Sequence, residues 1–259
     1  MDTLSAQPFA GRKVLIVGIA NEYSIAYGCA KAFRELGADL AITYLNDKAE
    51  PYVRAVAESL PASLIMPCDV SVPGQLEAVF ARIKQEWGKL DFVLHSIAFA
   101  PAADLHASLI DCSADGFALA MDISCHSFIR MAKLAVPLMT DGGSLMTVSF
   151  YGSERAVDHY NLMGPVKAAL ESSVRYLAAD LALRRIHVHA ISAGVVKTRA
   201  ASGLDHFDAL LDEVRNRTPA QHLVTIEEIG RIAAVLASDA GMTLTGSTLY
   251  ADAGFHVVA

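Results

Sequence analysis

Tyr160 and Lys167 are the residues whose types and spacing point most directly to chemistry. Lys167 follows Tyr160 by seven positions, close to two helical turns, so on one helix the two side chains would face the same way, about 10 Å apart along the axis. An ammonium group there can bind a ribose, while a phenol reaches further, towards a substrate. The alternative is a solvated start of a core helix with no catalytic role.

Gly164 and Pro165 lie between the tyrosine and the lysine. Proline fits a helix only in its first turn, because it lacks an N–H and clashes with the preceding turn. The helix is therefore predicted to begin near Asn161 or Leu162. This start places Tyr160 at the mouth of a site and Lys167 inside it.

Short apolar runs alternate with longer helical patterns along the whole chain, and this alternation must position the pair. The continuous apolar character of the runs indicates strands buried on both faces, as in a parallel sheet. The pattern predicts a single α/β domain over residues 1–259, a doubly wound (Rossmann-type) seven-stranded parallel sheet. The predicted strands are 13–18, 39–44, 63–69, 90–96, 144–149, 187–192 and 247–252, and the predicted helices lie near 24–36, 48–59, 73–87, 114–139, 162–183, 206–216 and 226–238.

The composition narrows the class of protein. Apolar residues make up 53% of the 259 residues, and the formal net charge is −7. Without a basic tract, nucleic acid and anionic membranes are not expected partners. The four cysteines form no CxxC pair, which indicates reduced thiols and a cytoplasmic location. His187 and His189 share a strand face without matching carboxylates or thiols, so we expect no metal site and predict that they pack or hydrogen-bond at the strand's edge.

The turn after the first predicted strand is a candidate phosphate site. Gly18 can bend sharply, and the amides that open the next helix would then point at an anion. Ser24 is placed as an N-cap or as a hydroxyl donor to a pyrophosphate. Ala20 and Ser24 stand where a GxGxxG fingerprint would have glycines, so an ordinary strand–helix turn is the alternative.

Other candidate ligand contacts follow the second, third and fourth strands, since ligands of such sheets sit at the carboxyl ends of the strands. Asp69 could hold an adenine amino group, although a turn cap is the common role of a lone aspartate. The backbone of residues 96–98 could pass beneath an adenosine ribose. Leu45 offers no charge to a 2′-phosphate, which favours NADH over NADPH, while Lys48 keeps NADPH open.

The combined pattern resembles the short-chain dehydrogenase/reductase superfamily. Most of its members carry Tyr-x3-Lys, whereas the position four before Lys167 is Met163. The wider Tyr-x6-Lys spacing resembles the branch of enoyl-acyl carrier protein reductases that use NADH. The segments that share the resemblance are GIANEYSIAYG (18–28), TYLNDK (43–48), CDV (68–70), HSIAFAP (95–101), DISCHSF (122–128), SERAVDHYNLMGPVKAALE (153–171), AISAGVVKTRAASG (190–203) and TIEEIG (225–230).

The resemblance implies reduction of a trans-2-enoyl thioester, carried on acyl carrier protein or on CoA, in fatty-acid elongation. Tyr160 would hydrogen-bond the thioester oxygen and Lys167 would orient the cofactor ribose. Residues 195–216 would form the substrate-binding loop and helix. Besides Lys167, the implied cofactor contacts are Gly18, Ser24, Ile25, Leu45, Asp69, Val70, Ser96, Ile97, Ala98, Gly194, Val196 and Thr198; besides Tyr160, the implied substrate contacts are Ala100, Phe150, Ala200 and Phe207.

Three features depart from the family pattern. Phe150 occupies the position ten before Tyr160, where the family often has a second tyrosine, and the neighbouring Tyr151 would point the other way unless a turn brought it round. The predicted helix after the loop is acidic, at Asp205, Asp208, Asp212 and Glu213, which would oppose an acidic carrier protein. Pro165 and Val166 could shift the start of the lysine-bearing helix and so the reach of Lys167.

Two other functions remain open on the sequence. One is a carbonyl reductase or alcohol dehydrogenase of the same superfamily, which Met163 disfavours. The other is a non-catalytic NAD-binding paralogue, which Phe150 and the acidic helix allow but which would not need Tyr160. The resemblance further implies a homotetramer that uses the helices near 114–139 and 162–183.

Overall fold

The seven apolar runs form the seven strands of one parallel sheet in the computed structural model, which describes residues 7–198 and 207–258. The side chains of residues 207–210 are not among those it describes. The strands are β1 (Lys13–Val17), β2 (Asp39–Tyr44), β3 (Leu64–Pro67), β4 (Phe92–His95), β5 (Gly143–Ser149), β6 (Ile186–Ala193) and β7 (Ser247–Ala251). The predicted fold class is confirmed, and each predicted strand is present.

The strand order is β3-β2-β1-β4-β5-β6-β7, with all neighbours parallel. The chain runs outward from β1 to β3 and then returns to pair β4 with the other side of β1. This reversal opens a crevice at the carboxyl ends of β1 and β4, the place where ligands bind in such sheets. Gly18 and Ser96 follow these two strands directly.

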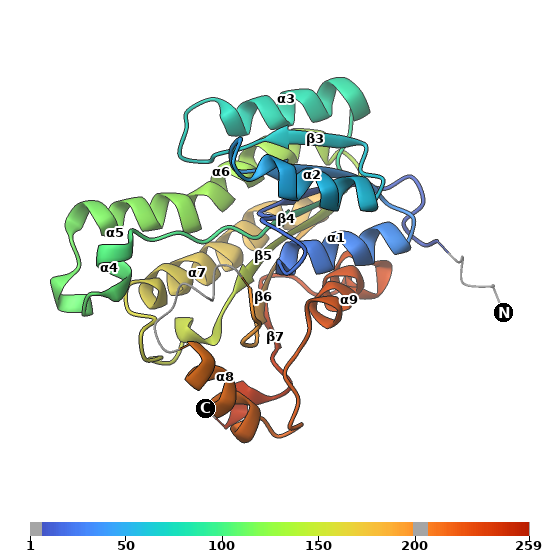
Figure 1. Cartoon of the computed structure of the whole chain (residues 1–259). Coiled ribbons are helices and arrows are strands. Elements are labelled where there is room, and N and C mark those ends of the chain that lie inside the picture. Colours follow the sequence, from blue (N-terminus) through green and yellow to red (C-terminus); the bar gives the residue numbers. More distant parts are fainter. Residues whose placement is uncertain (1–6, 199–206, 259) are drawn as a thin grey trace.

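Helices cover both faces of the sheet because each carries one apolar side (Figure 1). Helices α1, α2 and α9 pack on one face, and α3, α6 and α7 pack on the other. The α-helices are α1 (Ile25–Glu35), α2 (Glu50–Ser59), α3 (Gln75–Trp87), α4 (Ala102–His106), α5 (Ala114–Met121), α6 (Ser127–Ala135), α7 (Met163–Leu181), α8 (Phe207–Arg217) and α9 (Ile226–Ala237).

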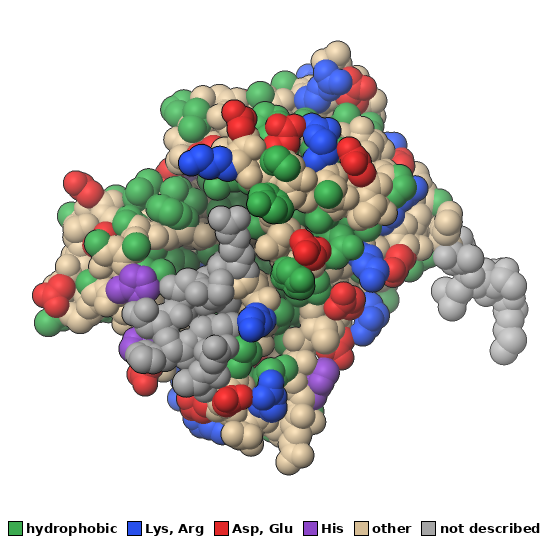
Figure 2. Space-filling view, viewed as in Figure 1, with side chains coloured by type: hydrophobic (Ala, Val, Ile, Leu, Met, Phe, Trp, Pro, Cys, Tyr) green, Lys and Arg blue, Asp and Glu red, His purple; other side chains and the backbone are tan. Residues whose placement is uncertain are grey.

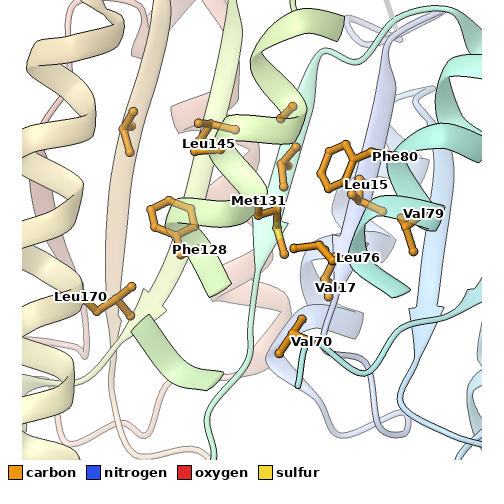
Figure 3. Packing of buried hydrophobic residues seen from close by; sticks show 14 of the residues in the cluster. Leu15, Val17, Val70, Leu76, Val79, Phe80, Phe128, Met131, Leu145 and Leu170 are labelled. Carbon is orange, nitrogen blue, oxygen red and sulfur yellow. The ribbon is translucent and has the colours of Figure 1, made fainter. Parts of the chain in front are cut away.

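Figure 3 shows the core between the sheet and the second group of helices. Leu15 and Val17 of β1 and Leu145 of β5 meet Phe128 and Met131 of α6 there, and all five are at most 1% exposed. Leu76, Val79 and Phe80 extend the same cluster along α3, and Leu170 extends it along α7. The site-bearing helix α7 is therefore fixed to the sheet by the core.

Helices α1 and α9 approach each other through two glycines. A Cβ at Gly28 would lie 2.1 Å from the carbonyl oxygen of Ile226, and a Cβ at Gly230 would lie 2.2 Å from the carbonyl oxygen of Gly28. Helix α9 begins with a capping box in which Thr225 and Glu228 bond each other's backbone. This close packing fixes the start of α1, which borders the crevice.

The predicted continuous helix over 114–139 is wrong in one respect. A π-helical turn, η2 (Asp122–His126), separates α5 from α6, and a 3-10 turn, η3 (Val136–Leu138), ends the segment. Within η2, the Ser124 hydroxyl accepts a hydrogen bond from the Phe99 N–H (2.8 Å) and donates one to the Phe99 carbonyl oxygen (2.9 Å). This bonding to another segment accounts for a break that helical periodicity does not reveal. The short helix α4 was also not predicted.

Among the described residues, no helix combines the length and apolar character that crossing a bilayer requires. Acidic and basic side chains are intermixed on the face shown in Figure 2.

Candidate active site

A cavity of about 310 Å³ opens at the carboxyl ends of β5 and β6, and it contains both residues of the predicted pair. Segments far apart in sequence supply its walls: the loop after β4, the end of β5, the start of α7 and the segment after β6. Its lining residues are Ile25, Ala98, Phe99, Ala100, Leu105, Val148, Ser149, Phe150, Tyr160, Met163, Lys167, Ala193, Gly194, Val195, Val196 and Thr198.

Tyr160 lies in the turn that precedes α7, not on the helix itself. Helix α7 begins at Met163, slightly later than predicted, with Pro165 in its first turn. The residues on either side of Tyr160 have left-handed backbones, with φ of 62° at His159 and 38° at Asn161. The Asn161 side chain donates to the Leu105 carbonyl oxygen (2.9 Å), which ties this turn to α4. Tyr160 and Lys167 thus share the cavity, but the turn brings them together instead of one helix face.

The Tyr160 ring is held by an aromatic and a glycine contact. Phe150 packs against it edge-on, with ring centroids 4.9 Å apart. A Cβ at Gly152 would lie 2.6 Å from Cδ1 of the Tyr160 ring, so only glycine allows this approach. Burial raises the pKa of Tyr160, and the charge of Glu171 raises it further. The phenol therefore remains protonated and able to donate at neutral pH.

Lys167 is 5% exposed, and its Nζ donates to the Val148 carbonyl oxygen (2.7 Å). Burial lowers the pKa of Lys167 to about 8, while Glu171 and Cys125 raise it in opposition. The ammonium form is thus retained at neutral pH, held at the end of β5 on the cavity wall.

The turn after β1 bends sharply at Gly18, as predicted, but the contact that requires a glycine there is with another chain segment. Gly18 has a φ of 111°, and a Cβ there would lie 2.0 Å from the Ser96 carbonyl oxygen. The glycine is therefore required by the contact between two chain segments at the sheet's crevice. Ser24 occupies the N-cap position of α1, but its Oγ accepts from the amides of Ala20 (3.0 Å) and Asn21 (3.2 Å) instead of capping the helix.

The predicted contacts after β2 and β3 follow the carboxyl ends of those strands. The Asp69 Oδ1 accepts from the Ser71 N–H (2.9 Å) and hydroxyl (2.6 Å), which is the turn-cap role given above as its alternative. Val70 is buried in the core, and its carbonyl oxygen accepts from Arg130 (2.6 Å). Leu45 is 53% exposed, so its side chain is accessible beyond β2.

Of the other predicted cofactor contacts, Ile25, Ala98, Gly194, Val196 and Thr198 line the cavity, whereas Ser96 and Ile97 precede it on the loop after β4. Among the predicted substrate contacts, Ala100, Phe150 and Tyr160 line it. Ala200 and the side chain of Phe207 lie outside the described residues, as do Asp205 and the side chain of Asp208.

Tyr151 does not replace the hydroxyl that Phe150 lacks. A 3-10 turn, η4 (Tyr151–Ser153), follows β5, but it directs the Tyr151 ring onto Phe255 (centroids 5.1 Å apart), away from the cavity. The cavity wall at this position is therefore an apolar ring, as the sequence departure indicated.

The described part of α8 carries paired charges. Asp212 bonds Arg215 (2.9 Å), and Glu213 bonds Arg217 (2.8 Å). Each of these acidic side chains therefore has a basic neighbour that offsets its charge. The prediction of an acidic helix did not take these basic neighbours into account. Arg217 also donates to the Val258 carbonyl oxygen (2.7 Å), which joins α8 to the C-terminal segment beside it (Figure 1).

His187 and His189 lie on β6, an inner strand of the sheet, and His189 packs as predicted. His189 is fully buried, and neither ring nitrogen has a hydrogen-bond partner, so it packs as an apolar ring. Burial lowers its pKa to about 4. Within the residues that the structure describes, no three His, Cys, Asp or Glu side chains gather as metal ligands would.

Five lining residues were missed from the sequence besides Phe99: Leu105, Val148, Ser149, Ala193 and Val195. Four residues whose contacts shape the site were missed as well: Phe99 and Ser124, whose hydrogen bonds tie the loop after β4 to η2, Gly152, which lies against Tyr160, and Glu171, which lies one turn after Lys167. The segments HSIAFAP, DISCHSF and SERAVDHYNLMGPVKAALE contain all of them except Gly152, which directly precedes the last. Their position in or beside these segments could have indicated that they belong to the site. Their contacts could not be derived from the sequence, because they join residues that are far apart along the chain.

Proteins similar to this chain share one description, that of enoyl-acyl carrier protein reductases. The family model described as Enoyl-(Acyl carrier protein) reductase matches residues 18–256. Enoyl-[acyl-carrier-protein] reductase [NADH] 1 of Rhizobium meliloti (strain 1021) is 45% identical over 248 residues, covering 96% of this chain and 91% of that protein. The corresponding NADH enzyme of Aquifex aeolicus (strain VF5) is 43% identical over 249 residues, covering 96% and 92%.

A solved structure gives the same result in three dimensions. The crystal structure of the enoyl-(acyl-carrier-protein) reductase of Anaplasma phagocytophilum in complex with NAD superposes with a TM-score of 0.94 at 44% identity, covering 98% of this chain and 97% of that one. With near-complete coverage in sequence and in structure, the chain belongs to the enoyl-acyl carrier protein reductase family.

Proposed function

We propose that this chain reduces the double bond of trans-2-enoyl thioesters with NADH, as the enoyl-[acyl-carrier-protein] reductase of fatty-acid elongation. The observation that carries the proposal is the cavity shared by Tyr160 and Lys167, in which a partly buried phenol donor and a buried ammonium group face one apolar space. The printed names of the relatives, which specify NADH and acyl carrier protein, support it.

The crevice fits a dinucleotide on its own chemistry. The first turn of α1 has no acidic side chain and no side-chain cap, so its amides and the positive end of the helix dipole are available to a pyrophosphate. Gly18 keeps the turn open beside this end, and Lys167 lines the cavity, where it would bind a nicotinamide ribose. Leu45 presents no cation to a 2′-phosphate, which supports NADH as the preferred cofactor.

NADH, when bound, supplies the hydride that reaches the β-carbon of the substrate. The negative charge that then develops on the thioester oxygen needs a donor already in place. Tyr160 provides it, because burial keeps its phenol protonated and because Phe150, Gly152 and the tied turn restrict its ring. Lys167 orients the ribose through the ammonium hydrogens that Val148 does not occupy.

Substrate specificity is assigned to the apolar wall formed by Ala100, Leu105, Phe150 and Met163, with the segment 195–216 as the substrate-binding loop and helix. Met163 stands where a Tyr-x3-Lys enzyme would have its tyrosine, and it lines the cavity at 5% exposure. A thioether cannot donate a hydrogen bond, which disfavours the carbonyl reductase alternative.

The carrier is proposed to be acyl carrier protein, with CoA thioesters as the alternative. The ion pairs of Asp212 and Glu213 reduce the repulsion that an acidic carrier would meet at α8. Measuring kcat/KM for the same acyl chain on both carriers tests the assignment.

The chain is further proposed to act in the cytoplasm as a homotetramer. Exposed apolar side chains lie on the segments predicted for the contacts: Phe117 (41%) and Leu119 (40%) on α5, and Tyr176 (74%) on α7. Light scattering on the purified protein tests the assembly; a monomer would contradict it.

The proposal as a whole is tested by NADH oxidation with an enoyl thioester. The wild-type chain should turn over, and Tyr160→Phe should lose most of the rate. NADH binding without turnover on any enoyl thioester would instead favour the non-catalytic paralogue.

A further inference from the structure

Glu171 is a buried carboxylate to which the mechanism above gives no role. It lies on α7, one turn after Lys167, and is 4% exposed. Burying a carboxylate costs several kcal/mol unless hydrogen bonds and opposite charge offset it. The groups around Glu171 therefore indicate what its charge is held there to do.

Lys167 and Glu171 bind two consecutive residues at the end of β5. Lys167 Nζ donates to the Val148 carbonyl oxygen, and the Ser149 hydroxyl donates to Glu171 Oε1. The Ser153 hydroxyl, from the turn η4, donates to the same Oε1 (2.7 Å). One carboxylate oxygen thus joins α7, the end of β5 and η4.

The turn that Glu171 holds is the one that contacts Tyr160. Gly152 lies between Tyr151 and Ser153 in η4, and a Cβ there would lie 2.6 Å from Cδ1 of the Tyr160 ring. A Cβ at Gly164, in the first turn of α7, would in turn lie 3.1 Å from the Gly152 carbonyl oxygen. A displacement of η4 towards Tyr160 would therefore meet its ring, and a displacement away would remove the contact.

Glu171 also supplies a negative charge that raises the pKa of Lys167, against the lowering that burial causes. The groups that act on Lys167 are Glu171 on α7 and Cys125 on η2, and Lys167 in turn lowers the pKa of His95 on β4. Glu171 further raises the pKa of Tyr160 and of Tyr250 on β7. Of these neighbours, Glu171 is the carboxylate, so its loss would favour the neutral form of Lys167.

We propose that Glu171 is a positioning residue for the reduction: its carboxylate fixes η4 against Tyr160 and keeps Lys167 in its ammonium form. The inference rests on the proposed function for the roles of Tyr160 and Lys167. Its two parts are separable, because one depends on the hydrogen bonds to Oε1 and the other on the charge.

Two substitutions separate these parts. Glu171→Gln keeps an acceptor for Ser149 and Ser153 but removes the charge, whereas Ser153→Ala keeps the charge and removes one bond. Glu171→Asp serves as the conservative variant. Asp180→Asn, which removes an exposed carboxylate from the same helix, is the matched control. Thermal melting of each variant reports whether it folds.

Two readouts are followed from pH 6.5 to 9.5: the affinity for NADH by fluorescence titration, and kcat and KM with an enoyl thioester. Glu171→Gln should move the alkaline loss of NADH affinity and of kcat to lower pH by about one unit. Ser153→Ala should leave this pH dependence unchanged but lower kcat about tenfold with little change in KM, since misplacing a catalytic group is costly. Glu171→Asp should recover the wild-type pH dependence, and Asp180→Asn should match the wild type.

A Glu171→Gln protein with the wild-type pH dependence and kcat would overturn the charge role, and a Ser153→Ala protein with wild-type kcat would overturn the positioning role. If Glu171→Gln does not fold, Glu171→Asp and Ser153→Ala still decide the positioning role. The charge role would then be excluded if the NADH affinity of the wild-type protein did not fall as the pH rises past about 8. A wild-type protein that binds NADH but reduces no enoyl thioester would contradict the proposed function instead, and the NADH titrations would then decide the role of Glu171.

Discussion

Lys167 and Glu171, one turn apart on α7, bind the consecutive residues Val148 and Ser149 at the end of β5. The lysine donates to a backbone carbonyl oxygen, and the glutamate accepts from a side-chain hydroxyl. The helix and the strand therefore cannot slide past each other without breaking both hydrogen bonds. This arrangement places an ammonium group in the cavity and a carboxylate directly behind it. The pair that the sequence indicates, Tyr160 and Lys167, thus depends on a third charged residue for its position.

Gly152→Ala is expected to lower kcat with little effect on NADH binding. The new Cβ would lie 2.6 Å from Cδ1 of Tyr160, so the ring must move, and a displacement of about 1 Å can cost about a hundredfold in rate. Steady-state kinetics and NADH titration of the variant measure the two effects. A kcat within twofold of the wild type would show that the ring's position does not limit the reaction.

Gly28→Ala and Gly230→Ala are each expected to destabilise the fold by at least about 2 kcal/mol, although alanine is the better helix former. In both cases the Cβ would meet backbone of the facing helix, at 2.1 Å and 2.2 Å, and backbone cannot rotate away. Urea denaturation gives the free energy of unfolding.

The control for this pair is Arg231→Ala, which shortens an exposed side chain beside Gly230 on α9 and should change stability by less than about 0.5 kcal/mol. Because both glycines serve one helix contact, the double variant should lose less than the sum of the single losses. Additive losses would indicate that the helices do not meet as described.

Acidification is expected to destabilise the protein through His95. This ring is fully buried between Thr147 and Ser127 (2.8 Å to each hydroxyl), and burial lowers its pKa to about 3. The unfolded chain therefore takes up the proton first, near the ordinary pKa of about 6.5, and stability falls as pH drops from there towards 3, by up to about 1.4 kcal/mol per pH unit. Above pH 6.5 the contribution is constant.

Urea denaturation at pH 7.5, 6 and 5 measures this slope. His95→Gln, whose amide can replace part of the hydrogen bonding, should show a shallower loss of stability with acid. The slope should not vanish in His95→Gln, because His189 is also buried with a lowered pKa. An unchanged slope in His95→Gln would contradict the buried neutral imidazole.

The strands and most of the helices could be predicted from the sequence because their signals are local. Buried apolar runs define β1 to β7, and Gly37 and Pro165 mark a helix end and a helix start. The π-helical turn at Ser124 could not be predicted, because it depends on two bonds to Phe99, a residue 25 positions away. Helix α4 was missed because its five residues are too few for a periodic pattern.

The site was predictable as a set of segments but not as a set of contacts. Tyr160, Lys167, Gly194 and Val196 line the cavity as expected. Glu171, by contrast, reads in sequence as an ordinary helix-surface charge, and only the packing of α7 on β5 shows that it is buried. The predicted contact of Asp69 with an adenine amino group likewise depends on a bound ligand. The hydrogen bonds observed for Asp69 are those to Ser71 within its own turn.

The central claim is tested most directly by following NADH oxidation with a trans-2-enoyl thioester on acyl carrier protein and on CoA, in parallel for the wild type and Tyr160→Phe. The account predicts turnover by the wild type with the carrier-protein substrate preferred, and a kcat lower by about a hundredfold or more in the variant, with NADH affinity unchanged. Equal rates in the wild type and the variant would contradict the role of Tyr160. Failure of the NADH-bound wild type to reduce either thioester would contradict the reductase itself.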